Sequence, residues 1–172
     1  VGESAGVGEF VVLRDVGSSY RDGAEANLLR MVRSTDDIGS LNRHLHRSAQ
    51  GWAEQYHLDR RRANVLRGFD LSHVDRALEI GAGCGAVTRY LAESVAVVDA
   101  LEPVPARAAV AAQRLRDLPG ARVFVGEVDD LPDEAGYDLV VVIGVLVLRT
   151  TCEVELGLTD KPVVVPHLKC LT

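Results

Sequence analysis

The sequence predicts an α/β domain built on a doubly wound parallel sheet. Short apolar segments typical of strands alternate with segments of helical periodicity over residues 77–148. The strand segments are apolar at consecutive positions rather than at every second one, which is typical of strands buried on both faces. Strands and helices that alternate with short links form a parallel sheet with helices on each side.

Each strand of the predicted sheet is a compact apolar run. The runs are ALEI at 77–80, VAVVDAL at 95–101, RVFV at 122–125 and YDLVVVIGVLVL at 137–148. Helices are expected between them at 86–93 and 103–118, since Pro103 suits a first helical turn and Pro119-Gly120 ends a helix. Beyond residue 148 only VVV at 163–165 is strand-like, and the prolines on both sides restrict it to an edge.

The first seventy residues predict helices, apart from the strand-like FVVL at 10–13. The spacing of apolar residues favours three helices, at 23–32, from Ser34 onward and at 56–67. Ile38, Leu41 and Leu45 are spaced for the buried side of the second helix. A helical N-terminal segment therefore precedes the predicted sheet.

Composition limits the classes of partner. The net charge of −6 argues against general nucleic-acid binding, which needs a basic surface. No apolar run approaches the roughly 20 residues that span a bilayer, and no signal-peptide pattern opens the chain. The scattered cysteines Cys84, Cys152 and Cys170 suit a reducing compartment better than a disulfide framework or a zinc site. We expect a cytoplasmic protein with no nucleic-acid, membrane or metal partner.

A glycine-rich turn follows the first central strand. Gly81, Gly83 and Gly85 alternate in ALEIGAGCGA, and Glu79 lies two residues before the first of them. Glycine permits a positive φ and removes the side chain that would block a ligand. Because ligands of such sheets bind beyond the carboxyl ends of the strands, we expect the turn to line a binding site.

Two classes of ligand fit this turn. The dinucleotide pattern G-x-G-x-x-G/A matches Gly81, Gly83 and Ala86. Glu102 lies about twenty residues further on, where that pattern places an acid on the ribose. Glu79 argues against a dinucleotide, because a carboxylate at the strand tip repels a pyrophosphate. It favours a cationic ligand such as S-adenosylmethionine, whose single carboxylate would meet the glycine amides and the N-terminus of the following helix.

Four motifs in order resemble the class I S-adenosylmethionine-dependent methyltransferases of the bacterial, small-molecule type. They are LEIGAGCG at 78–85, DALEP at 99–103, GEVDDLP at 126–132 and YDLVVVIGVL at 137–146. YHLDRRRANVLR at 56–67 also resembles the helix before the core in bacterial members. The resemblance implies a Rossmann-like sheet. That sheet is incomplete in its C-terminal half, because residues 149–172 are too few for the family's remaining strands and helices.

The resemblance also implies contacts with the cofactor. Glu102 would hold both ribose hydroxyls, while Val128 and Asp129 would border the adenine in competition with Glu127 and Asp130. Gly144 would end the fourth strand beneath the methionine portion. The remaining implied contacts lie in the first motif, at Glu79, Gly81, Ala82, Gly83 and Gly85.

The implied activity is transfer of a methyl group from S-adenosyl-L-methionine to a small molecule. The cofactor is already activated, so the protein mainly positions the acceptor, and the sequence does not identify a catalytic residue. His57 is a candidate cover or base, although a structural role is more common for such a residue. Because some bacterial members are fused to glycosyltransferases, the resemblance suggests fusion to, or association with, such an enzyme.

We expect three parts. They are a helical segment over 1–70 (a lid or the remnant of a preceding domain), an S-adenosylmethionine-binding core over 71–148 and an atypical tail over 149–172. Two other functions stay open. The dinucleotide spacing fits an NAD(P)-binding oxidoreductase, and the missing strands fit a non-catalytic, truncated cofactor-binding fragment.

Overall fold

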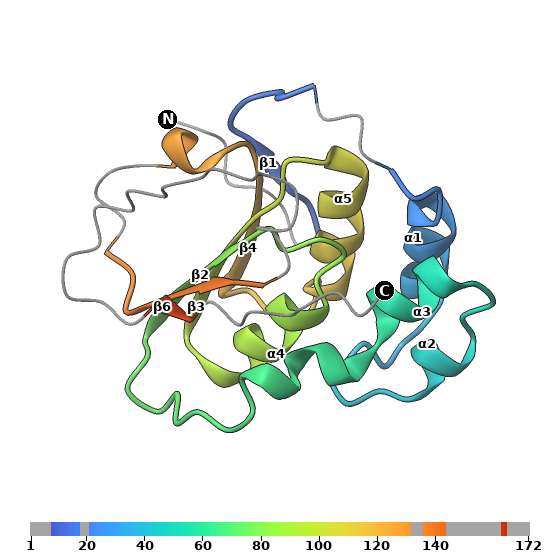
Figure 1. The fold of residues 1–172 in the computed structure, drawn as a ribbon, viewed down its shortest axis with the longest axis horizontal. Coiled ribbons are helices and arrows are strands. Elements are labelled where there is room, and N and C mark those ends of the chain that lie inside the picture. The colour runs from blue at the N-terminus through green and yellow to red at the C-terminus, as the bar shows by residue number, and fades with distance from the viewer. Residues whose placement is uncertain (1–7, 18–20, 132–135, 144–162, 165–172) are drawn as a thin grey trace, which may run out of the picture.

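The computed structural model describes residues 8–17, 21–131, 136–143 and 163–164. Its strands form one parallel sheet in the order β1-β4-β3-β2-β5-β6 (Figure 1). The strands are β1 (Val11–Val12), β2 (Arg76–Ile80), β3 (Val97–Leu101), β4 (Ala121–Val125), β5 (Leu139–Val142) and β6 (Val163–Val164). The strand order reverses at β2, so the carboxyl end of β2 is the switch point where such sheets bind ligands. The predicted fold class is confirmed, and the predicted edge strand is β6.

The helices of the described residues flank this sheet. They are α1 (Glu25–Arg33), α2 (His44–Arg47), α3 (Trp52–Leu58), α4 (Ala86–Ser94) and α5 (Pro105–Arg114), with 3-10 turns η1 (Arg60–Val65) and η2 (Val128–Asp130). α4 links β2 to β3 and α5 links β3 to β4, as the alternation predicts. Ala77 and Val98 on the sheet pack against Val87 and Leu91 of α4.

The opposite face of the sheet has a smaller described cluster. Leu78, Tyr137, Val140 and Val142 form it, and no α-helix within the described ranges adds a residue to it. The sequence predicts helices on both faces of the sheet. Within the described residues, helices pack on one face.

The predicted helix from Ser34 is wrong. Residues 34–43 form a loop, and α2 begins only at His44. The Asp37 carboxylate accepts the Gly39 amide at 3.0 Å and the Asn42 side-chain oxygen accepts the His44 amide at 2.6 Å. Such side-chain bonds offer the backbone an alternative to helix.

The burial of the loop and the bounds of the next helix also differ from the prediction. Ile38 and Leu45 are buried as predicted, but Leu41 is 60% exposed because the helical spacing that would bury it is missing. The helix predicted at 56–67 is divided at Asp59, which has an extended backbone and accepts the Arg61 amide at 2.9 Å to begin η1.

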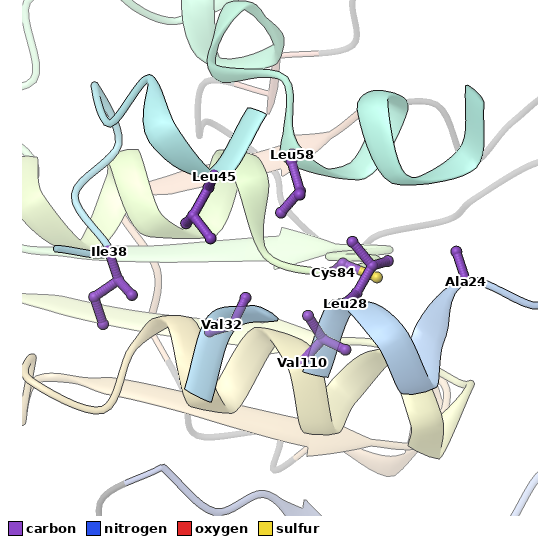
Figure 2. Close-up of a cluster of buried hydrophobic side chains, with 8 residues drawn as sticks. All are labelled: Ala24, Leu28, Val32, Ile38, Leu45, Leu58, Cys84 and Val110. Carbon is purple, nitrogen blue, oxygen red and sulfur yellow. The ribbon is translucent and has the colours of Figure 1, made fainter. Parts of the chain in front are cut away.

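The N-terminal helices pack on the sheet domain through one apolar cluster. Figure 2 shows α1, α3 and α5 contributing side chains that meet around Cys84 of the glycine-rich turn. The members are Ala24, Leu28, Val32, Ile38, Leu45, Leu58, Cys84 and Val110. The glycine-rich turn is thus held from behind by residues far away in the sequence.

Asp99 occupies the middle of β3 and is only 1% exposed. Arg76 of β2 and Arg122 of β4 bond its carboxylate at 2.7 Å and 2.8 Å, and the Tyr137 hydroxyl donates to it at 3.0 Å. Asp99 therefore lies inside the sheet, away from both ends of β3. Its charge is balanced by arginines on both neighbouring strands.

We predict that Asp99→Asn lowers the free energy of unfolding by about 3 kcal/mol, because it leaves both arginines without their charged partner. Tyr137→Phe removes one hydrogen bond and is expected to cost about 1 kcal/mol. Urea denaturation measures both changes. Equal losses for the two variants would contradict the central role of the carboxylate.

Candidate functional site

The turn after β2 depends on left-handed backbone at alternate residues. Gly81, Gly83 and Gly85 have φ of 77°, 56° and 77°. The amides of Gly81 and Ala82 donate to the Leu101 carbonyl at 2.8 Å and 3.0 Å. The turn is therefore docked on the tip of β3, at the switch point of the sheet.

The second and third glycines of the turn face different surroundings. A Cβ on Gly85 would lie 2.9 Å from the Ala111 Cα, so glycine here allows the start of α4 to approach α5. A Cβ on Gly83 would meet nothing within 4 Å. Gly83 is therefore the one beside open space, which suits close approach of a ligand.

Glu102 follows β3 and lies against Gly83. Its carboxylate accepts the Gly83 amide at 2.7 Å and the Val104 amide at 3.0 Å, and the residue is 4% exposed. Burial raises the pKa of Glu102, while the two amide bonds oppose that rise. Each carboxylate oxygen can accept more than one hydrogen bond, so acceptor sites remain for hydroxyl groups of a ligand.

Glu79 lies under the turn, on the face of the sheet that α4 covers. It is 2% exposed, and Thr88 of α4 donates its hydroxyl to the carboxylate at 2.5 Å. Burial raises the pKa of Glu79 to about 7, against smaller opposing effects that include the nearby charges of Arg62 and Arg114. The group therefore changes charge near neutral pH. A solvent-facing position for Glu79 is ruled out.

The amides of all three glycines have acceptors within the protein. Gly81 donates to Leu101, Gly83 to Glu102, and Gly85 to the Ala82 carbonyl at 3.0 Å. The first turn of α4 remains as the source of backbone donors, because the first amides of a helix have no partner inside it. The glycine amides are therefore already bonded and do not meet a ligand carboxylate, although the sequence predicts that contact. The first amides of α4 are left as the donors for that carboxylate.

The three acids of the loop after β4 have different surroundings. Glu127 and Asp130 form a reciprocal capping box around η2, and both pair with Arg14, at 2.8 Å and 2.9 Å. Asp129 is exposed and, among the described residues, its side chain has no hydrogen bond or ion pair. Val128 beside it is half-buried. Of the three competing acids, Asp129 is therefore the one left available to a ligand.

A cluster of charged residues that the sequence did not predict links the N-terminal segment to α5, next to Glu102. His57 Nε2 lies 2.7 Å from the Asp22 carboxylate, which Arg107 of α5 bonds at 3.1 Å. The positive charge of Arg107 acts on Glu102 and lowers its pKa. Burial lowers the pKa of His57, which favours its neutral form. His57 thus has a partner, but Asp22 lies 35 residues away and nothing in the sequence pattern pairs them.

Cys84 and Gly144 are the other residues of the glycine-rich turn and the fourth strand that the sequence singled out. Cys84 is buried and its pKa is raised by burial to about 12, which argues against a nucleophilic role. Gly144 lies outside the described residues. Within the described ranges, no helix is long and apolar enough to cross a membrane.

Comparison with known proteins points to one class of enzyme. Residues 78–152 match the family model described as "Methyltransferase domain". Over 83 residues, the chain is 40% identical to a protein-L-isoaspartate O-methyltransferase of Roseiflexus castenholzii (strain DSM 13941 / HLO8). That match covers 46% of this chain and 38% of the relative's length.

Solved structures of methyltransferases are also similar. The N-methyltransferase NodS of Bradyrhizobium japonicum in complex with S-adenosyl-L-homocysteine is 25% identical, with 72% of this chain and 58% of that one covered and a TM-score of 0.45. Phosphoethanolamine N-methyltransferase 1 of Haemonchus contortus is 20% identical, with 71% and 25% covered and a TM-score of 0.44. In each case the chain spans less than two thirds of the relative.

We predict that Gly85→Ala destabilises the fold more than Gly83→Ala. Both substitutions place alanine in left-handed backbone, at about 1 kcal/mol each. Only the first also forces a clash with Ala111, which adds about 1–3 kcal/mol. Thermal unfolding of the two variants measures the difference, and equal melting temperatures would contradict the close approach of α4 to α5.

Proposed function

We infer that this chain, which carries the cofactor-binding core of a class I S-adenosylmethionine-dependent methyltransferase, binds S-adenosyl-L-methionine and transfers its methyl group to an acceptor. One contact carries the proposal. The Gly83 amide bonds the Glu102 carboxylate at 2.7 Å, so the first two family motifs meet at the carboxyl ends of β2 and β3. The match of residues 78–152 to a methyltransferase domain supports the same function.

The proposed binding mode follows the sheet edge. Glu102 accepts the ribose hydroxyls beside Gly83, while Val128 and Asp129 border the adenine. The first turn of α4 receives the methionine carboxylate, because its free amides and the helix dipole favour an anion. Gly81, Ala82, Gly85 and Gly144 shape the methionine end. Apart from Gly144, which lies outside the described residues, these residues follow the carboxyl ends of β2, β3 and β4, where a parallel sheet binds its ligands.

Glu79 acts on the cationic part of the cofactor from beneath the turn. Its carboxyl group is buried and bonded to Thr88, so it reaches the ammonium through its charge or through a bridging water rather than by direct exposure. A positive ligand nearby favours the ionised form of the carboxyl group. Binding should therefore draw the proton from Glu79.

The chemical step asks little of the protein in acid or base groups. When bound, the cofactor supplies an activated methyl group whose bond to sulfur breaks as the acceptor atom attacks. The protein's task is to hold the acceptor in line with that bond and to exclude water. We propose that the helical segment over 1–70, apart from β1 in the sheet, serves as the lid for this task, since Asp22 bonds both His57 and Arg107 beside Glu102. The proposal also assigns residues 71–148 to the cofactor-binding core and residues 149–172 to an atypical C-terminal tail.

The acceptor stays unassigned. The names of the relatives point to different acceptors, including phosphoethanolamine and isoaspartyl protein. A small-molecule acceptor, a cytoplasmic location and association with a glycosyltransferase are the proposals that follow from the sequence resemblance.

We predict that S-adenosylhomocysteine binds more tightly than NADH in titration calorimetry. Glu102→Gln should weaken S-adenosylhomocysteine binding by about tenfold, because the hydroxyl groups lose a charged acceptor. Glu127→Gln is the matched control, since Glu127 is used in the capping box and in the ion pair with Arg14. Tighter NADH binding would instead support the oxidoreductase, to which the Gly81-Gly83-Ala86 spacing also conforms.

We predict that the affinity for S-adenosylmethionine increases as the pH rises from 6 to 8. With a pKa of about 7 the Glu79 carboxyl group is mostly neutral at the lower pH, and only its ionised form attracts the ammonium. The increase below the pKa approaches about tenfold per pH unit at most. Calorimetry across this range should show the rise for the native protein and a flat, weaker profile for Glu79→Gln. A rise of the same size in the variant would show that another group titrates.

The same carboxyl group has the opposite effect on folding. Its pKa in the folded protein lies above the ordinary value of 4.5, so the fold prefers the protonated form. Its contribution to stability is therefore complete below about pH 4.5 and is lost as the pH rises through about 7. Binding and stability thus depend on the pH in opposite senses.

A further inference from the structure

Arg114 joins the glycine-rich turn to the N-terminal helices. It is the last residue of α5 and is 3% exposed. Its Nη1 atom donates to the His57 carbonyl at 3.0 Å and to the Cys84 carbonyl at 3.3 Å. One guanidinium nitrogen therefore holds the C-terminal end of α3 and the centre of the turn together.

The surroundings of this arginine are unusual for a structural ion. Among the described residues no carboxylate lies within ion-pair distance of Arg114, and its buried Nε has no hydrogen-bond partner. Burial lowers the pKa of Arg114 to about 10, so the side chain still carries its charge at neutral pH. Arg89, which is also buried, pairs instead with Glu93 and Asp117. The charge of Arg114 is thus balanced by carbonyl dipoles, including those at the C-terminus of α3.

The contacts on either side of Arg114 form a continuous route. On the cofactor side, Cys84 follows Gly83, whose amide bonds Glu102. On the other side, His57 joins Asp22, at the start of the segment that leads into α1. A ligand that fixes the turn therefore acts on the carbonyl that Arg114 holds, and the arginine passes that constraint to α3.

We propose that Arg114 is a positioning residue that couples occupancy of the cofactor site to the placement of α3 and the charged cluster beside it. The inference rests on the proposed function, because it needs a cofactor at the glycine-rich turn. It assigns the N-terminal helices a response to the cofactor, so that the lid closes on a loaded site. Arg114 itself touches neither cofactor nor acceptor in this account.

Trp52 gives a direct readout, because it is the single tryptophan of the chain and lies on α3 with 74% of its surface exposed. The test titrates S-adenosylhomocysteine into the native protein while Trp52 emission is followed, with calorimetry in parallel. Hydrogen exchange of the backbone amides over 52–65 is measured with and without the same ligand. The native protein should show a change in emission that follows the calorimetric curve, and slower exchange over these residues.

The variant Arg114→Met should bind S-adenosylhomocysteine about tenfold more weakly, because the turn loses its fixed carbonyl. At saturating ligand it should show no response of Trp52 or of the α3 amides. Arg116→Met is the matched control. Arg116, two residues after α5 ends, also donates to N-terminal carbonyls, those of Val32 and Thr35, but it does not contact the turn. This control should keep both the affinity and the response.

Circular dichroism and thermal unfolding establish that each variant is folded. If Arg114→Met does not fold, Arg114→Lys replaces it, since lysine keeps a charge and a donor but not the arginine geometry, and the response should then be reduced. A native protein that binds the ligand without any response at α3 would overturn the coupling alone. A full response in the folded Arg114 variant would do the same. Absence of binding to the native protein would overturn the proposed function as well.

Discussion

The left-handed backbone of the glycine-rich turn is the constraint on which the rest of the structure depends. It lets Gly81 and Ala82 share the Leu101 carbonyl, so the chain leaves β2 and reaches the tip of β3 within one turn. The same path brings Gly83 to Glu102 and allows Gly85 to pass close to Ala111. A side chain at Gly85 would push α4 away from α5 and separate the elements that define the site.

The N-terminal helices depend on the same turn from its other side. Cys84 takes part in their apolar cluster, and its carbonyl accepts from Arg114. The turn beside Glu79 and Glu102 is therefore supported by a layer of apolar contacts and by an arginine-to-carbonyl bond. Because Cys84 directly follows Gly83, whose amide bonds Glu102, the proposed lid and the proposed ribose site are linked through this turn.

The sheet was predictable from the sequence because each strand is a continuous apolar run whose neighbours follow in order. The loop over 34–43 was not, since the short polar side chains of Asp37 and Asn42 bond the backbone locally and override the helical spacing. The hydrogen-bond partners of Asp99 and His57 could not be predicted from the sequence either. Their partners come from strands or helices distant in sequence, and only folding brings them together.

The acids of the site were predicted by position but not by environment. Glu79 and Glu102 were expected beside the turn, and both lie there, yet their burial and the shifted pKa of each depend on tertiary packing. Asp129 is the acid left available to a ligand because its neighbours, Glu127 and Asp130, form the capping box. Local motifs indicate which residue types meet a ligand, whereas burial decides their charge.

We propose that one cofactor molecule lies along the carboxyl ends of β2, β3 and β4. Amide chemical shifts in a ¹⁵N-labelled sample, followed during titration with S-adenosylhomocysteine, test it most directly. We expect shifts at Gly83, at the first turn of α4 and at Val128 and Asp129, all saturating at one ligand concentration. Shifts confined to other parts of the chain, or none at all, would contradict it.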